Sequence, residues 1–247
     1  MTTIIGIDCA VEEGNVGVAI GEYDEGVCAL TPLPNRVNTG WVSKLVCDTI
    51  NGSTRTILAL DAPLGWPAAL GTALCDHLAG SEISTSPSLL FRRATDRFIK
   101  THLDKQPLDV GADRIARTAK AALDLLTQVR KQTGFSIPLI WNAAFTEKVG
   151  AIEVYPAGTL VSHGLPNSGY KKDNQAAVRK RILGELGKLM NLCDDLRVAE
   201  NNADILDAIV CVLSGADFLR GQAYFPYDEA EAKKEGWIWV KRRKETP

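Results

Sequence analysis

The chain has 247 residues, of which 45% are hydrophobic, and a formal net charge of −2. This length is sufficient for one substantial core, and the charge excludes a strongly basic nucleic-acid binder of the histone type. Apolar runs fall short of the ~20 residues that a membrane-spanning helix needs, and the first residues lack a secretory signal. The six cysteines are scattered without a C-x-x-C pair, so we expect no structural zinc site and a reducing, cytoplasmic environment without membrane contact.

The first sixty residues predict a sheet with one crossover helix. Residues 3–8 are apolar and β-branched, as in a buried strand, and residues 16–20 and 27–30 predict two further strands after turns. Apolar residues at helical spacing predict a helix over 38–50, and residues 54–60 predict another buried strand. Three antiparallel strands, a helix and a parallel strand are the opening order of an RNase H-like sheet. A right-handed crossover then puts the fourth strand beside the first.

A helical insertion is predicted after the fourth strand. It covers residues 62–142, has the character of a lid, and includes a helix from about 112 to 131. The core pattern then resumes with predicted elements at 151–155 (strand), 173–190 (helix), 203–219 (helix) and 237–240 (strand). Because we find no internal repeat and no clear linker, we predict one α/β domain over residues 1–247. Its mixed sheet combines a three-stranded antiparallel meander with parallel strands and is flanked by helices.

Two aspartates end two of the predicted central strands. Asp8 ends the first strand and Asp61 ends the fourth, so we expect them side by side at the carboxyl edge of the sheet. Converging carboxylates are costly to desolvate and cannot pair with one another, whereas divalent cations can bind several of them. The alternative is that each aspartate simply starts a turn. Their joint position in this strand order favours a metal site.

Three further acids are candidates for the same site. Asp204 and Asp207 are three residues apart at the start of an apolar helix and therefore lie on one side of it. We interpret Asp207 as a metal ligand and Asp204 as a second ligand or a helix cap. Glu153 lies in a strand that is otherwise apolar. It is either a further ligand that orients water or the partner of an arginine in the insertion.

Basic residues suggest a place for phosphate. Arg92, Arg93 and Arg97 lie in the insertion, and arginine suits bidentate phosphate contacts, although such a cluster also occurs as a solvated face or an internal ion-pair network. Lys171 and Lys172 precede a helix, where they would meet a phosphate or form plain surface. Cys9 is interpreted as a buried thiol rather than a nucleophile, because no histidine is suitably placed.

Five motifs in this order resemble a known family. They are Gly6-Ile7-Asp8, Asp61-Ala62-Pro63-Leu64-Gly65-Trp66-Pro67, Arg93-Ala94-Thr95-Asp96-Arg97, Glu153-Val154-Tyr155-Pro156 and Asp204-Ile205-Leu206-Asp207-Ala208. Together they resemble domain-of-unknown-function family 429, a group described as predicted nucleases of RNase H fold, over nearly the whole chain. The resemblance implies site acids at Asp8, Asp61, Glu153 and Asp207. It also implies that the insertion contributes Arg93, Asp96 and Arg97.

The leading prediction is a Mg²⁺- or Mn²⁺-dependent phosphodiester hydrolase, a nuclease acting on nucleic acid or on a small phosphodiester. Two divalent ions can activate water and stabilise the leaving oxygen in such a reaction. The predicted ligands are Asp8, Asp61, Asp204 and Asp207, with Glu153 assisting and Arg92, Arg93 and Arg97 holding phosphate. A non-catalytic nucleotide or nucleic-acid binding module with a structural metal site is the alternative. An actin-like phosphotransferase is a third hypothesis, which would need a duplicated domain.

Overall fold

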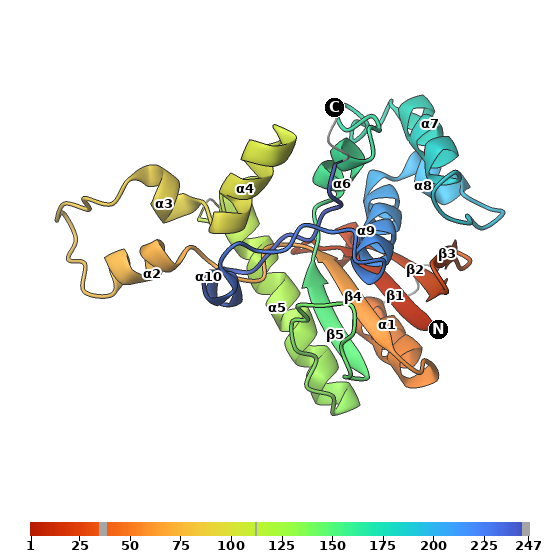
Figure 1. Ribbon diagram of the computed structural model, residues 1–247, viewed down its shortest axis with the longest axis horizontal. Helices are drawn as coiled ribbons and strands as arrows, with labels where there is room; N and C mark the ends of the chain where they lie inside the picture. Colours follow the sequence, from red (N-terminus) through yellow and green to blue (C-terminus); the bar gives the residue numbers. More distant parts are fainter. Residues whose placement is uncertain (35–38, 112, 244–247) are drawn as a thin grey trace.

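The computed structural model describes residues 1–34, 39–111 and 113–243, so the helix starts predicted at residues 38 and 112 lie outside the described residues. Its centre is a five-stranded mixed sheet in the order β3-β2-β1-β4-β5 (Figure 1). The strands are β1 (Thr2–Asp8), β2 (Gly17–Asp24), β3 (Val27–Leu30), β4 (Thr56–Asp61) and β5 (Val149–Glu153). The first three form the antiparallel meander, and β4 and β5 run parallel to β1. This arrangement confirms the predicted RNase H-like fold class.

The pairing of β1 with β4 determines where the site acids lie. In the parallel register, Ile4 is aligned with Ile57 and Asp8 with Asp61, so the two aspartates end neighbouring strands at the same edge. Both strands are almost continuously apolar because each is covered on both faces by helices. The chain thus brings two carboxylates together without any side-chain recognition, through strand register alone.

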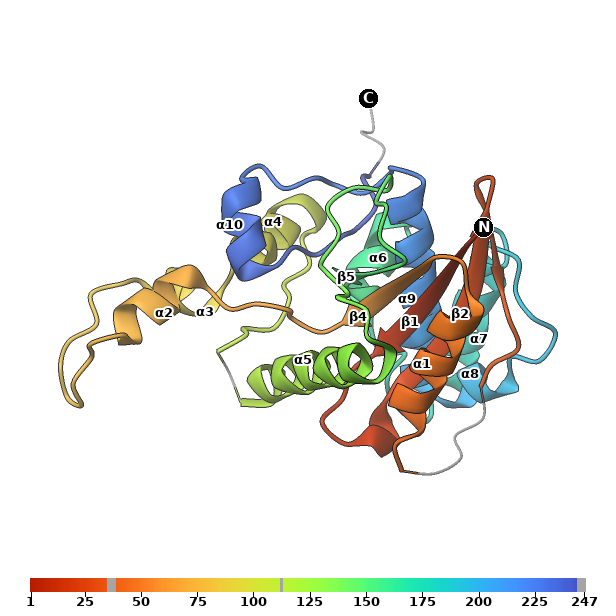
Figure 2. The ribbon, with the colours of Figure 1, turned by 90° about the horizontal axis from the view of Figure 1, so that it is seen from below.

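One face of the sheet is covered by a long apolar helix and several short ones (Figure 2). The helices on this side are α6 (Pro156–Ser162), α7 (Ala176–Leu186), α8 (Arg197–Asn201) and α9 (Ala203–Leu219). Helix α9 packs directly on β1 and β2, and nearly all of its residues are buried. Ile4 and Ala59 of the sheet belong to this core, which also takes in Trp237–Val240 near the end of the described chain.

The opposite face is covered by α1 (Trp41–Gly52) and α5 (Asp113–Thr133), which also contact each other. Ile5 and Leu58, the strand neighbours of the residues that face α9, point into this second core. The alternation follows from the two-residue period of a strand. Helix α5 was predicted as part of the insertion. Its Leu126 packs with this sheet core, and the division of the chain into core and insertion stays a prediction.

Residues between β4 and α5 form a projecting arm that is anchored at one end. Its helices are α2 (Ala68–Leu74), α3 (Pro87–Phe91) and α4 (Ala94–Leu103). In both ribbon views α2 and α3 extend away from the sheet, whereas α4 lies close to α10 (Glu229–Glu235) (Figures 1 and 2). The strand predicted at 237–240 is wrong as a regular element, because Ile238 forms only a single-residue bridge with Glu153. In the part of the chain that is described, no helix is long and apolar enough to cross a bilayer.

Candidate metal centre

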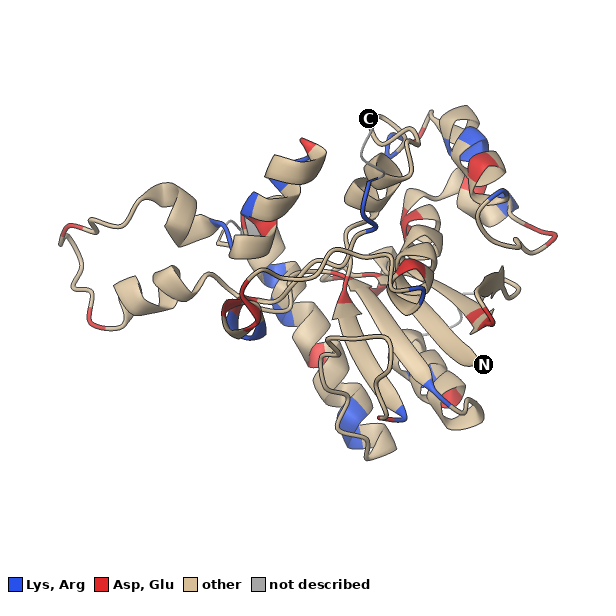
Figure 3. Ribbon diagram, viewed as in Figure 1, with Lys and Arg blue, Asp and Glu red and all other residues tan. Residues whose placement is uncertain are grey.

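Three carboxylates meet at the carboxyl edge of the sheet. Asp8 comes from the end of β1, Asp61 from the end of β4 and Asp207 from the second turn of α9. Each offers a carboxylate oxygen, and these oxygens all lie within 4.8 Å of one another. Figure 3 shows acidic residues at the ends of the central strands. Asp207 is fully buried, whereas Asp8 and Asp61 are partly exposed.

Helix α9 reaches the strands because two glycines leave room for it. A Cβ atom on Gly6 would lie 2.2 Å from the carbonyl oxygen of Ala208, and one on Gly17 would lie 2.0 Å from that of Asp204. The helix begins at Asn202, whose side chain accepts hydrogen bonds from the backbone N–H groups of residues 204 and 205. The cap is therefore Asn202, and the close approach places Asp207 opposite the strand ends.

The cluster is electrostatically unfavourable for three charged carboxylates. Burial raises the pKa of Asp61 to about 7; Lys171 lowers it, and Asp207 and Glu153 raise it. Burial, followed by the charges of Asp61 and Asp207, also raises the pKa of Asp8 well above its ordinary value. The pKa of Asp207 is raised mainly by burial, with Lys171 opposing. Such a site favours protons or cations, because neighbouring carboxylates disfavour each other's ionised form.

Lys171 and Tyr170 belong to the site, and the sequence did not reveal them. The ammonium nitrogen of Lys171 lies 2.6 Å from Asp207 Oδ2, and the Tyr170 hydroxyl donates a hydrogen bond of 2.7 Å to Asp207 Oδ1. Our interpretation from the sequence left Lys171 as surface or as a phosphate contact. No local pattern distinguishes it from Lys172, because its role depends on a loop that returns to the sheet edge.

Asp8 and Asp61 open into a small cleft of about 230 Å³. Asp8, Asp61 and Lys171 line one part of it, and residues from the predicted insertion, Leu108 and Ile115 among them, line another. Cys9 lies at the same place, half-buried, and burial raises the pKa of its thiol, as do the charges of Asp8 and Asp61. The neutral thiol that this favours is in keeping with the structural role predicted for it.

Glu153 lines the cleft but has different partners from the three aspartates. Its carboxylate forms a two-point ion pair with Arg93, with distances of 2.7 and 2.8 Å, and it accepts a 2.9 Å hydrogen bond from the Leu64 N–H. Arg93 also pairs with Asp96 at 2.9 Å and is itself only 1% exposed. Of the two roles left open for Glu153, pairing with an arginine of the insertion is the one present in this structure.

The other predicted site residues lie at the edge of this arrangement. Asp204 is half-buried one turn before Asp207, and its charge raises the pKa of Asp8 and of Asp207. Arg92 forms a half-exposed ion pair with Asp109 at 2.9 Å. Arg97 donates to the carbonyl oxygen of Arg92 and lies 3.8 Å from a carboxylate oxygen of Glu231. The structure therefore gathers Asp8, Asp61 and Asp207, and places the arginines in ion pairs within the insertion and between it and β5 or α10.

The donor set of the cluster fits a hard divalent cation. Carboxylate oxygens are the ligands that Mg²⁺, Mn²⁺ and Ca²⁺ prefer, and oxygens that bind one such ion lie within about 5 Å of one another. The three aspartates meet this spacing. The partial exposure of Asp8 and Asp61 leaves the cluster open toward the cleft, where water and a substrate oxygen would complete the coordination.

Comparison with known proteins identifies a family and finds likeness to solved structures. No curated protein sequence matches the chain. Among solved structures, the chain is similar to T. thermophilus RuvC in complex with Holliday junction substrate, with 10% sequence identity, a TM-score of 0.39, and coverage of 90% of this chain and 97% of that one. The sequence model of the family described as "Protein of unknown function (DUF429)" matches residues 6–232. The resemblance noted from the motifs is thereby confirmed, and the chain belongs to the DUF429 family.

Proposed function

We propose that the protein is a Mg²⁺- or Mn²⁺-dependent phosphodiester hydrolase. One observation carries the proposal: oxygens of Asp8, Asp61 and Asp207 converge within 4.8 Å at the carboxyl edge of an RNase H-like sheet, and Asp8 and Asp61 line a cleft there. Three clustered carboxylates destabilise the folded chain unless cations neutralise them, and Lys171 brings a single positive charge to the cluster.

Asp8, Asp61 and Asp207 would hold the cation, and Asp204 would assist from the preceding turn of α9. The bound cation would supply charge stabilisation for a phosphoryl oxygen and would lower the pKa of a water molecule. The rigid strand ends fix the positions of Asp8 and Asp61, since both are paired in the centre of the sheet. Substrate enters through the 230 Å³ cleft, over which we propose that residues 62–142 act as a lid.

Glu153 and Arg93 have a positioning role in this proposal. Their buried ion pair joins the end of β5 to the start of α4, and so fixes the wall of the cleft opposite the aspartates. Arg92 and Arg97 remain candidates for phosphate contact, because both are partly exposed. The free cysteines support a reducing compartment, so we place the activity in the cytoplasm.

Titration of Mn²⁺ into the metal-free protein tests the site without a guess at the substrate. We expect specific binding that Asp8→Asn and Asp61→Asn each weaken by more than the 10–100-fold typical of losing an outer-shell partner. The matched control is Asp48→Asn on α1, whose side chain is 64% exposed and pairs with Lys44 of the same helix. Circular dichroism would establish that each variant is folded.

Hydrolysis assays with small phosphodiesters and single-stranded oligonucleotides then separate the two leading functions. Metal-dependent turnover that disappears in Asp8→Asn supports the hydrolase. Binding of Mn²⁺ without turnover of any of these substrates supports the non-catalytic nucleotide or nucleic-acid binding module. Full activity in a folded Asp8→Asn variant contradicts the proposal.

A further inference from the structure

Lys171 reaches into the carboxylate cluster from outside. Its ammonium nitrogen lies 2.6 Å from Asp207 Oδ2, although 59% of its side chain is exposed and Asp207 is only 1% exposed. Its charge also acts on Asp61 and on Asp8, and it lines the cleft with both. The Lys171 ammonium therefore neutralises part of the negative charge of the cluster.

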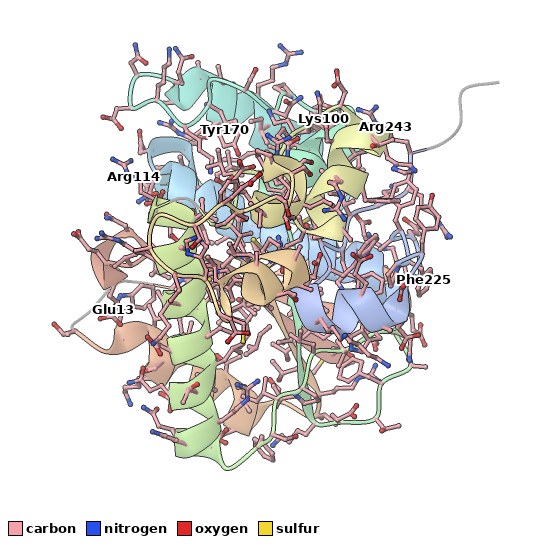
Figure 4. The ribbon with its side chains drawn as sticks, turned by 90° about the vertical axis from the view of Figure 1, so that its left-hand side faces the viewer. Glu13, Lys100, Arg114, Tyr170, Phe225 and Arg243 are labelled. Atoms are coloured by element: carbon pink, nitrogen blue, oxygen red, sulfur yellow. The ribbon has the colours of Figure 1, made fainter. Side chains whose placement is uncertain are left out.

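The backbone around Lys171 is held by buried hydrogen bonds, whereas more than half of the Lys171 side chain is exposed. Buried Arg179 donates hydrogen bonds to the carbonyl oxygens of Tyr170 at 2.6 Å, of Lys172 at 2.8 Å and of Glu200 at 2.7 Å. Tyr170, labelled in Figure 4, is itself 1% exposed and bonds Asp207 through its hydroxyl. A long, exposed side chain can change rotamer while its backbone stays in place.

We propose that Lys171 is a built-in competitor of the divalent cation. In the metal-free protein its ammonium neutralises part of the three-aspartate cluster, and it withdraws toward the cleft when a divalent ion binds Asp207. This inference rests on the proposed function, since it assumes that the cluster is a metal site. In this proposal, Lys171 controls how readily a divalent cation occupies the site.

The competition follows from the contact with Asp207 Oδ2. An oxygen that holds an ammonium at 2.6 Å and a metal ion at about 2.1 Å would bring two cations within a few ångströms of each other. Their repulsion is strong in a partly desolvated site, so occupancy by one disfavours the other. The other oxygen, Oδ1, keeps its bond to Tyr170 in either case, because a neutral hydroxyl does not repel the metal.

When a ligand needs a vacant site, its apparent association constant equals the intrinsic constant multiplied by the fraction of time for which the site is vacant. If the ammonium occupies the cluster for about nine-tenths of the time, its removal tightens the apparent Kd for the metal about tenfold. The effect has a direction that a merely structural lysine would not produce, since loss of a structural contact loosens a site.

Calorimetric titration of Mn²⁺ into wild type, Lys171→Met and Lys172→Met is the test. Methionine keeps the length of the stem and removes the charge. We expect Lys171→Met to bind Mn²⁺ about tenfold more tightly and Lys172→Met to bind as wild type does, since exposed Lys172 is not part of the cleft. An unchanged or weaker affinity in Lys171→Met overturns the inference.

A second measurement uses the unaltered protein. Wild type is treated with an amine-acylating reagent with and without Mn²⁺, and labelling at Lys171 and Lys172 is compared by peptide mass spectrometry. We expect Mn²⁺ to increase labelling of Lys171 relative to Lys172, because the ammonium has been released from its carboxylate. Equal or reduced labelling of Lys171 overturns the inference even if Lys171→Met does not fold.

The failure of this inference is distinguishable from failure of the proposed function. If wild type binds Mn²⁺, Asp8→Asn abolishes this binding and Lys171→Met leaves it unchanged, the metal site is supported. The competing role of Lys171 is then overturned. Absence of Mn²⁺ binding in wild type and in Lys171→Met overturns both. Binding that is detectable only in Lys171→Met supports both.

Discussion

At the scale of single residues, the charge of Asp61 lowers the free energy of unfolding of the metal-free protein. Its carboxyl group lies among Asp8, Asp207 and Glu153, and burial raises its pKa from 3.8 to about 7. A folded state in which an acid has a raised pKa binds protons more readily than the unfolded chain does. The free energy of unfolding therefore falls as pH rises from about 4 to about 7. Above that range the Asp61 contribution has reached its full, destabilising value.

Asp61→Asn should stabilise the metal-free protein at pH 8 while it weakens Mn²⁺ binding. A shift of one pKa unit corresponds to about 1.4 kcal/mol, so after allowance for the partial exposure of Asp61 we expect a gain of about 1–3 kcal/mol at pH 8. Little gain is expected at pH 4, where wild-type Asp61 is protonated when folded. Urea denaturation in EDTA at both pH values measures this. The same pH dependence in wild type and variant would contradict the argument.

At the scale of elements, the close contact between β1 and α9 decides the geometry of the site. Asp8 and Asp207 lie on these two elements, and Gly6 lets them approach, because its missing side chain makes room for the backbone of Ala208. The contact is between main chains, so a neighbouring side chain cannot rotate to relieve a clash. Space at one glycine therefore controls the distance between ligands on a strand and on a helix.

Gly6→Ala should separate β1 from α9. The new Cβ would lie 2.2 Å from the Ala208 carbonyl oxygen and 2.9 Å from the Val212 amide nitrogen, so we expect a loss of about 1–3 kcal/mol and weaker Mn²⁺ binding. Gly52→Ala at the end of α1 is the control. Nothing lies within 4 Å of its added Cβ, and its stability should change by less than about 1 kcal/mol. Equal stability of the two variants in urea denaturation would refute the close-contact account.

At the scale of the whole molecule, the end of the described chain fastens the projecting arm to the sheet. Glu235 of α10 is buried, and its two carboxylate oxygens accept hydrogen bonds of 2.7 Å from the N–H groups of Ala68 and Ala94, which begin α2 and α4. Its carbonyl oxygen accepts a hydrogen bond from Arg93. One side chain thus caps two helices that are far from it in sequence, and the same segment bridges to β5 through Trp239.

Glu235→Ala should loosen the arm without unfolding the sheet. It leaves two helix-start N–H groups without their acceptor, at a cost of about 1–3 kcal/mol each where they are buried. We expect faster amide hydrogen exchange over residues 68–103 and unchanged exchange in β1 and β4. Glu229→Ala, which removes an exposed pair with Lys233, is the control and should have little effect. Uniform loss of protection across the molecule would show that the arm and the sheet unfold together.

The sequence by itself determined the order of the first four strands of the sheet and the placing of Asp8 and Asp61 at one edge. These depend on local signals: apolar runs that end in aspartate, turns between them, and a helix of the right length before a parallel strand. The apolar α9, predicted at residues 203–219, was found at Ala203–Leu219 for the same reason. Short helices such as α2, α3 and α6 were not predicted, because five to seven residues carry too little periodicity.

Only the tertiary structure decided which charged groups meet. Glu153 and Arg93 are 60 residues apart, and Lys171 and Asp207 are 36 apart with helices α7 and α8 between them. Neither pair has a local pattern, because an ion pair depends on where the chain returns in space and not on the spacing of residues along it. Strand register is repeated at every residue and can be read from the sequence. A single contact between loop and helix is made once and can be read only from the fold.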